Sequence, residues 1–165
     1  MDGLCVNQEL VSLLRSWPYT LGMAQSKRKV NRRIEYYAYY SVSGSFDPVE
    51  ITKRAGTVPT GCSREGDRIP GSQQRYKCSR WSLHSRIEKT DSDLEHHVVD
   101  VLNQLDANSD VFKQLSVELD GVMQLVAYFN YDSSPGLSFG EKVIRRLAEY
   151  SLYLDCDFYY PRSDK

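Results

Sequence analysis

Two aspartates close to the C-terminus have the type and spacing that could do chemistry. Asp155 and Asp157 are two positions apart in a predicted strand, so their side chains point to the same face, roughly 7 Å apart. Paired carboxylates at such a separation could bind a divalent metal ion or act as general acid and base. The sequence offers no third ligand, and acidic residues on a terminal strand also protect a sheet edge from aggregation. We therefore predict no metal site and no cofactor.

Two adjacent histidines, His96 and His97, suggest a metal ligand pair or a general base. Both fall in a predicted amphipathic helix, where consecutive residues diverge by about 100°, so their rings would not converge on one ion. We place His97 at the border of the apolar stripe and His96 on the polar side. The pair is interpreted as structural.

A small-residue turn, Ser43-Gly44-Ser45, precedes a predicted helix and could mark an anion site. Gly44 stands alone, however, no GxxxxGK[ST] follows, and Asp47 places a carboxylate where a phosphate would bind. A capping turn is the better interpretation. Nucleophilic catalysis has no support either, because there is no G-x-S-x-G and no recognisable Cys–His pair. We assign no catalytic residue.

The four cysteines, Cys5, Cys62, Cys78 and Cys156, lack the spacing of a zinc site or a CxxC redox pair. Cys78 and Cys156 fall in predicted strands, and we interpret them as reduced residues in or near the core, which suits a reducing compartment. No apolar run approaches the roughly 20 residues of a membrane span, and no signal peptide is recognisable. We expect a cytoplasmic protein that does not associate with a membrane.

The best-defined elements form a strand-turn-helix unit at the start of the domain. An aromatic-rich strand is predicted from Ile34 to Val42. A helix follows over Pro48–Ala55, with Asp47 as N-cap, Glu50 at the third helical position and Gly56 as C-terminal cap. A long irregular loop then runs from Thr57 to about Gln74, and its length suggests a functional role.

The remaining pattern alternates strands and helices. A second strand runs from about Tyr76 to Ser85, with Trp81 as a core anchor. A capping box at Ser92–Glu95 then opens a helix whose apolar positions are Leu94, Val98, Val101, Leu102 and Leu105, and a short helix follows near Asp110–Leu115. A strand is predicted over Val122–Asp132. A second capping box at Ser138–Glu141 opens a helix with apolar positions Val143, Ile144, Leu147 and Ala148, and the last strand covers Tyr153–Tyr160.

These elements predict an α+β domain. The segments Tyr39–Ala55 and Tyr131–Ala148 echo each other as strand, small-residue turn and helix. Two βαβ units joined by a helical segment would give a mixed four-stranded sheet, with the helices mainly on one face and each unit's two strands parallel. This arrangement is a ferredoxin-like sandwich.

The domain organisation is one folded unit with two flanking segments. The chain has 165 residues, and we expect the domain over residues 34–160, with a C-terminal tail over 161–165. We expect residues 1–33 to be a poorly ordered N-terminal extension, and Met23 is a possible true start. Residues 1–90 carry 15 basic and 8 acidic side chains, whereas residues 91–165 carry 6 and 14, which predicts a basic and an acidic region.

Several short motifs resemble those of the bacterial DUF4279 family. They are Ser43-Gly44, Phe46-Asp47-Pro48, Ile51-Thr52, Pro59-Thr60, Arg64, Gly66-Asp67, Trp81-Ser82-Leu83, Asp93-Leu94-Glu95-His96-His97, Leu154-Asp155 and Asp157-Phe158-Tyr159. The resemblance covers about residues 34–160 and implies a small bacterial cytoplasmic protein. It implies no activity, cofactor or catalytic residue. Small α+β families of this kind often occur as immunity proteins beside polymorphic toxins.

The sequence favours a non-enzymatic protein-binding domain, most concretely an immunity protein that occludes a cognate bacterial toxin. Its contact surface would be the acidic helical block or the loop over residues 57–74. The residues nominated for the acidic surface are Asp91, Asp93, Glu95, Asp100, Asp106 and Asp110.

Two other functions stay open at this point. A small enzyme or ligand-binding domain would have its site between the loop over residues 57–74 and the sheet. The candidates for that site are Arg64, Asp67, Arg80, Trp81, Asp155 and Asp157. Nucleic-acid binding through the basic run near Lys27 is disfavoured, since the run has no interleaved aromatic residues and no recognition helix. The oligomeric state does not follow from the sequence.

Overall fold

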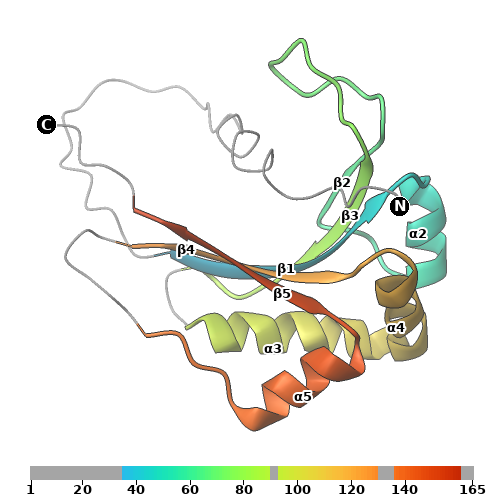
Figure 1. Cartoon of the computed structure of the whole chain (residues 1–165). Helices are drawn as coiled ribbons and strands as arrows, with labels where there is room; N and C mark the ends of the chain where they lie inside the picture. Colours follow the sequence, from blue (N-terminus) through green and yellow to red (C-terminus); the bar gives the residue numbers. More distant parts are fainter. Residues whose placement is uncertain (1–34, 90–92, 130–135, 161–165) are drawn as a thin grey trace, which may run out of the picture.

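The computed structural model describes residues 35–89, 93–129 and 136–160 (Figure 1). The predicted N-terminal extension, Asp91, Ser92 and the predicted C-terminal tail therefore lie outside the described residues. The strands are β1 (Glu35–Gly44), β2 (Gly61–Ser63), β3 (Ser79–His84), β4 (Val122–Tyr128) and β5 (Tyr153–Tyr159). The helices are α2 (Pro48–Ala55), α3 (Leu94–Leu105), the 3-10 helix η3 (Asp106–Asn108), α4 (Ser109–Glu118) and α5 (Glu141–Glu149).

The described strands form one mixed five-stranded sheet in the order β2-β3-β1-β4-β5. Strand β1 is central and pairs antiparallel with β3 and with β4, whereas β4 and β5 are parallel. The α+β class is confirmed. The predicted four-stranded sheet is wrong, because the predicted loop contains β2, which pairs antiparallel with β3.

Only the second of the two predicted βαβ units is present. Helix α5 connects the adjacent parallel strands β4 and β5, as expected. The first unit is wrong, because β3 runs antiparallel to its neighbour β1. The strand parallel to β1 is the short β2, which lies beyond β3 at the sheet edge. The ferredoxin-like arrangement is not confirmed.

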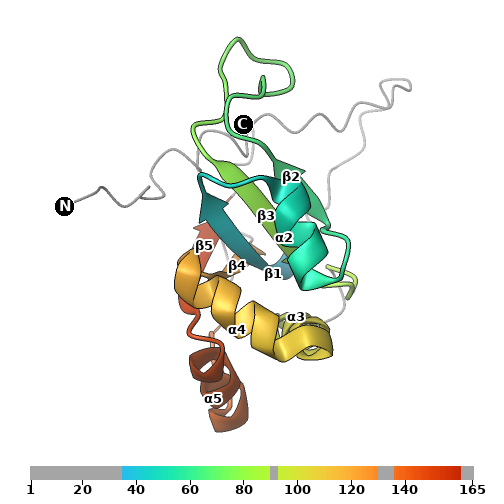
Figure 2. The ribbon, with the colours of Figure 1, turned by 90° about the vertical axis from the view of Figure 1, so that its right-hand side faces the viewer.

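The helices share one face of the sheet, as predicted. Figure 1 shows α3 and α5 below the sheet, and Figure 2 shows α2 beside β3 and α4 below β1. A single apolar cluster joins side chains of α2, α3, α4 and α5 to Tyr40, Trp81 and Leu125 of the sheet. Tyr40, Trp81 and Phe112 contact one another edge-on or tilted at ring-centre distances of 5.5–6.3 Å. We call this side of the sheet the helix face and the other side the outer face.

Helix α2 begins and ends as the sequence predicts. The Asp47 carboxylate accepts a hydrogen bond from the Val49 amide at 2.9 Å, Pro48 occupies the first helical position, and Gly56 ends the helix with φ of 65°. Positive φ at this position favours glycine, which has no Cβ. The start of the helix thus places Asp47 at the rim of the sheet.

The two predicted capping boxes are wrong in their N-caps. Helix α3 begins after Asp93, whose carboxylate accepts from the His96 amide at 3.1 Å. Helix α5 begins after Gly140 rather than Ser138. Its apolar face is narrower than predicted, because Val143 and Leu147 are buried but Ile144 and Ala148 are exposed.

Candidate functional site

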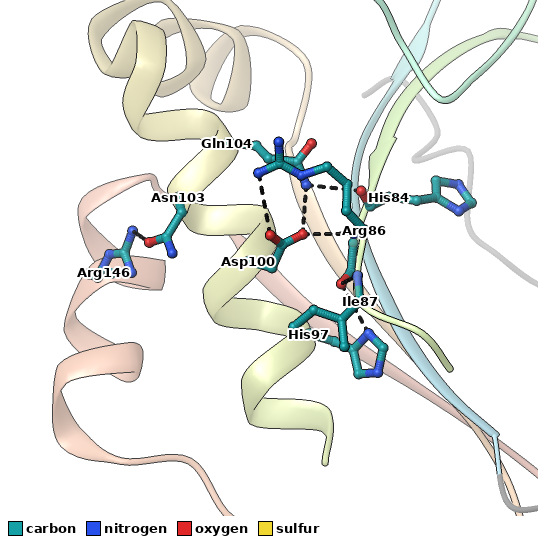
Figure 3. A network of polar contacts seen from close by, with 9 residues as sticks. His84, Arg86, Ile87, His97, Asp100, Asn103, Gln104 and Arg146 are labelled. Atoms are coloured by element: carbon teal, nitrogen blue, oxygen red, sulfur yellow. Dashed lines mark hydrogen bonds and ion pairs between the residues drawn. The ribbon is translucent and has the colours of Figure 1, made fainter. Parts of the chain in front are cut away.

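The nominated acidic residues of α3 hold neighbouring segments in place. Asp93 caps α3, and the Glu95 carboxylate accepts a hydrogen bond of 2.7 Å from the amide of Gly140, where α5 begins. Asp100 accepts from the Arg86 amide at 2.7 Å and from the Gln104 side chain at 3.0 Å (Figure 3). Asp100 thus joins α3 to the chain segment after β3, and Glu95 joins α3 to the start of α5.

The remaining acidic residues lie near the start of α4. Asp106 accepts a 2.6 Å hydrogen bond from the Tyr150 hydroxyl and pairs with Arg146 at 2.7 Å. Burial, followed by the bond to Asp106, raises the pKa of Tyr150. Asp110 is exposed in the first turn of α4. Four of the five nominated acidic residues that the structure describes are therefore already hydrogen-bonded or paired within the chain, which reduces their value as an acidic contact surface.

The candidates for the alternative ligand site do not converge. Trp81 is fully buried on the helix face, where its indole N–H donates to the Thr52 hydroxyl at 3.0 Å. Arg80 points to the outer face, since it alternates with Trp81 along β3. Arg64 pairs with Asp47 at 2.6 Å, at the rim of the sheet. Asp67 lies beyond it in the same loop.

Asp155 and Asp157 lie on β5, at the opposite edge of the sheet from that loop. Both point to the outer face, as their spacing predicts, beside Gln124 and Val126 of β4. The Gln124 amide donates to Asp157 at 3.1 Å. Burial and the neighbouring charge of Asp155 raise the pKa of Asp157. Among the described residues, no three His, Cys, Asp or Glu side chains form a group that could hold a metal ion.

The two histidines diverge, as the helix geometry predicts. His97 is completely buried, and its Nδ1 lies 3.0 Å from the Ser85 hydroxyl. Burial lowers its pKa. His96 is exposed on the polar side of α3. The two rings do not form a common site.

A stack of aromatic rings on the outer face was not predicted from the sequence. The His84 ring is stacked on Tyr39 at a ring-centre distance of 4.6 Å, and Tyr37 lies 6.4 Å from His84 and 6.3 Å from Tyr39 with its ring nearly parallel to both. Lys89 places its Nζ 4.2 Å above the Tyr37 ring, a cation–π contact. Burial raises the pKa of Tyr39 to about 12 and lowers that of His84 to about 4, so both rings are uncharged at neutral pH. The alternation of Tyr37 and Tyr39 was visible, but their partner His84 comes from another strand.

The second part of the predicted loop and the start of the predicted second strand form an ordered hairpin, which we call the arm (residues 64–77), and β3 begins only at Ser79. The arm projects from the sheet between β2 and β3 (Figures 1 and 2). Its two limbs are held by backbone hydrogen bonds from Gly66 to Tyr76 at 2.9 Å, from Tyr76 to Asp67 at 3.0 Å and from Ile69 to Gln74 at 2.9 Å. At its root, the Ser79 hydroxyl accepts from the Glu65 amide at 3.1 Å.

The arm presents polar side chains. Arg68 and Arg75 face each other across it as a bridged pair and are both exposed. The Arg68 guanidinium donates to Gln73 at 3.0 Å, and that of Arg75 donates to the Gly66 carbonyl. With four basic and two acidic residues, the arm is net basic.

Comparison with known proteins gives a family but no characterised relative. Within the described residues, no helix has the length and apolar character needed to cross a membrane. No curated protein and no solved structure matches the chain. The family described as "Domain of unknown function (DUF4279)" matches residues 34–161, which is most of the chain. The chain therefore belongs to the DUF4279 family.

Proposed function

We propose that the protein is a non-enzymatic protein-binding domain that contacts its partner through the arm. The observation that carries this proposal is that the arm is ordered by its own hydrogen bonds yet adds almost nothing to the core. Ile69 is its one buried residue, and it lies outside the core cluster.

The physical argument concerns the cost of ordering the arm. Fixing a backbone residue costs about 1–2 kcal/mol, which buried apolar area normally offsets. The arm buries little such area, so its contribution to stability does not explain why it is ordered. A preformed hairpin loses less entropy on binding than a disordered loop would, and this favours recognition.

The partner class follows from the arm's charge. Arginine is enriched at protein interfaces and binds carboxylates in a two-pronged geometry. Arg68 and Arg75 would therefore fit an acidic cleft, such as the carboxylate cluster of a metal-dependent nuclease toxin. Within this proposal the protein is an immunity protein that blocks such a toxin with the arm rather than with the acidic helical block. The free Cys62 and Cys156 thiols support a reducing, cytoplasmic location.

The test is capture of the partner with the tagged full chain, its Arg68→Gln/Arg75→Gln variant and Asp110→Asn. The arm variant removes both charges and keeps hydrogen-bond donors, whereas Asp110→Asn changes an exposed residue of the acidic block. We expect recovery of the partner to fall about tenfold with the arm variant and to stay unchanged with Asp110→Asn. Amide exchange at Gly66 and Tyr76 checks that the arm is still formed. Equal recovery with the arm variant would overturn the proposal, and loss with Asp110→Asn would indicate the acidic block instead.

A further inference from the structure

Within the described part of the chain, no strand pairs with the outer side of the β5 backbone. Among the described strands β5 pairs only with β4 and forms an edge of the sheet. The Tyr153 amide donates to Gly121 at 3.0 Å, and the Tyr159 carbonyl accepts from Phe129 at 2.9 Å, both on the β4 side. Because backbone groups alternate along a strand, those of Leu154, Cys156 and Phe158 point to the outer edge.

Apolar side chains of this edge are exposed. Leu154 and Phe158 are each 44% exposed and Tyr153 is 61% exposed. Leu154 and Phe158 align with Met123 and Ala127 of β4, so they lie on the helix face. The strand contains no proline and no lysine, two residues that commonly block edge pairing. The edge therefore has the backbone groups and apolar surface to accept another strand.

A second copy of this chain would pair unfavourably over most of β5. If β5 paired with β5 of a second copy around a two-fold axis, the two strands would be antiparallel. Each residue would then lie directly opposite a residue whose side chain is on the same face of the sheet. A register centred on Cys156 would oppose Asp155 to Asp157 of the second copy. A register centred on Asp155 or on Asp157 would oppose that carboxylate to its own copy, whereas registers centred on Leu154 or Phe158 avoid this but pair only one end of the strand. Like charges directly opposite each other are destabilising, so the two carboxylates select against the registers that pair most of β5.

We propose that β5 docks an extended basic segment of another protein, which adds to the sheet as a further strand. Its Lys or Arg residues lie beside Asp155 and Asp157 on the outer face, and its alternate apolar residues cover Leu154 and Phe158 on the helix face. Opposite charges across strands are favourable, and strand addition provides main-chain hydrogen bonds. Since β5 and the arm lie at opposite edges of the sheet, this inference does not depend on the arm.

The test uses two synthetic peptides of about eight residues, enough to span β5. One alternates Lys and Val, and its matched control alternates Glu and Val. Binding to the full chain is measured by calorimetry, and the site is located by amide hydrogen exchange. We expect only the Lys peptide to bind, with weaker binding at higher salt. It should slow exchange at Leu154, Cys156 and Phe158, whose amides face the edge, but not at Tyr153.

The Asp155→Asn/Asp157→Asn variant removes both charges with little change of shape. It should bind the Lys peptide about tenfold more weakly, while Asp110→Asn binds it like the native chain. Equal binding of the two peptides, or binding without protection of β5, would overturn the proposal. Self-association of the native chain that protects these same amides would assign the edge to a second copy instead.

Discussion

At the scale of single residues, a polar contact fixes the largest fully buried side chain of the described structure. Trp81 is completely buried, and its indole N–H donates to Thr52 of α2 at 3.0 Å. The Thr52 hydroxyl in turn donates to the Pro48 carbonyl at 2.9 Å. A buried donor without a partner is costly, so this bond specifies how α2 lies against β3.

Replacing Thr52 with valine should therefore destabilise the protein. Valine keeps the shape but leaves the Trp81 indole unpaired, which costs about 1–3 kcal/mol in the free energy of unfolding. Thr52→Ser, which keeps the hydroxyl, is the matched control and should lower the free energy of unfolding clearly less than Thr52→Val. Urea unfolding followed by tryptophan fluorescence measures both. If valine and serine were equally destabilising, the loss would come from packing and not from the hydrogen bond.

The His84 stack makes stability depend on pH. Burial lowers the pKa of His84 from 6.5 to about 4, so protonation favours the unfolded chain. The stability due to the neutral ring is fully present above about pH 6.5 and is lost as the pH falls toward 4. We expect the free energy of unfolding to fall over this interval by up to about 1.4 kcal/mol per pH unit from this group. Buried His97 contributes in the same direction.

The variant His84→Phe isolates that contribution. Phenylalanine can keep the ring stack with Tyr37 and Tyr39 but does not titrate. Urea unfolding across the interval should give a shallower pH dependence than in the native chain. Parallel curves for the two proteins would mean that His84 does not carry the effect.

At the scale of elements, the sequence correctly predicts the helices and strands whose ends are set by residues close by in the chain. Helix α2 is correct at both ends because Asp47, Pro48 and Gly56 act within one turn. Strand β2 could not be predicted, because three residues have no measurable periodicity and pair only through β3. The start of α5 depends on Glu95, 45 positions away, whose carboxylate binds the Gly140 amide. Such a contact is invisible to a local capping pattern.

The candidate site shows the same limit. The acidic residues were nominated as a contact surface because of their charge, but charge alone does not show whether a carboxylate already accepts a hydrogen bond from another part of the chain. Asp100 and Asp106 are bound by groups that come from other segments, Arg86 and Tyr150. The arm was predicted only as a functional loop, although Ile69-Pro70-Gly71 indicated a turn. Its pairing of Arg68 with Arg75 has no sequence signal.

The junction between α4 and β4 allows a sharp test of packing between elements. A Cβ added at Gly121 would lie 2.7 Å from Ser116 Cβ and 2.8 Å from Ser116 Cα. Gly121→Ala should thus push α4 from β4 and lower the free energy of unfolding by about 1–3 kcal/mol. The control is Asp120→Gly, because Asp120 has φ of 49° and glycine tolerates this value. Urea midpoints compare the two, and an unchanged midpoint for Gly121→Ala would contradict the close packing.

At the scale of the whole molecule, folding mixes the two charge halves of the chain. Arg54 pairs with Glu118 at 2.8 Å, and Arg86 pairs with Asp100 at 3.4 Å. Each pair joins a basic side chain from residues 1–90 to an acidic side chain from residues 91–165. The predicted basic and acidic regions are therefore partly neutralised against each other in the described structure, whereas the arm keeps a net basic charge.

This charge distribution predicts that added salt changes the free energy of unfolding little but weakens binding of the partner strongly. Exposed ion pairs such as Arg54–Glu118 contribute about 0–1 kcal/mol each, and salt screens them. Raising NaCl from about 50 to about 500 mM should therefore change the free energy of unfolding by less than about 1 kcal/mol, as measured by urea unfolding. Recovery of a partner bound through Arg68 and Arg75 should fall strongly over the same range, because charge attraction across an interface is screened. Salt-independent recovery would mean that apolar contacts, and not the arginines of the arm, hold the partner.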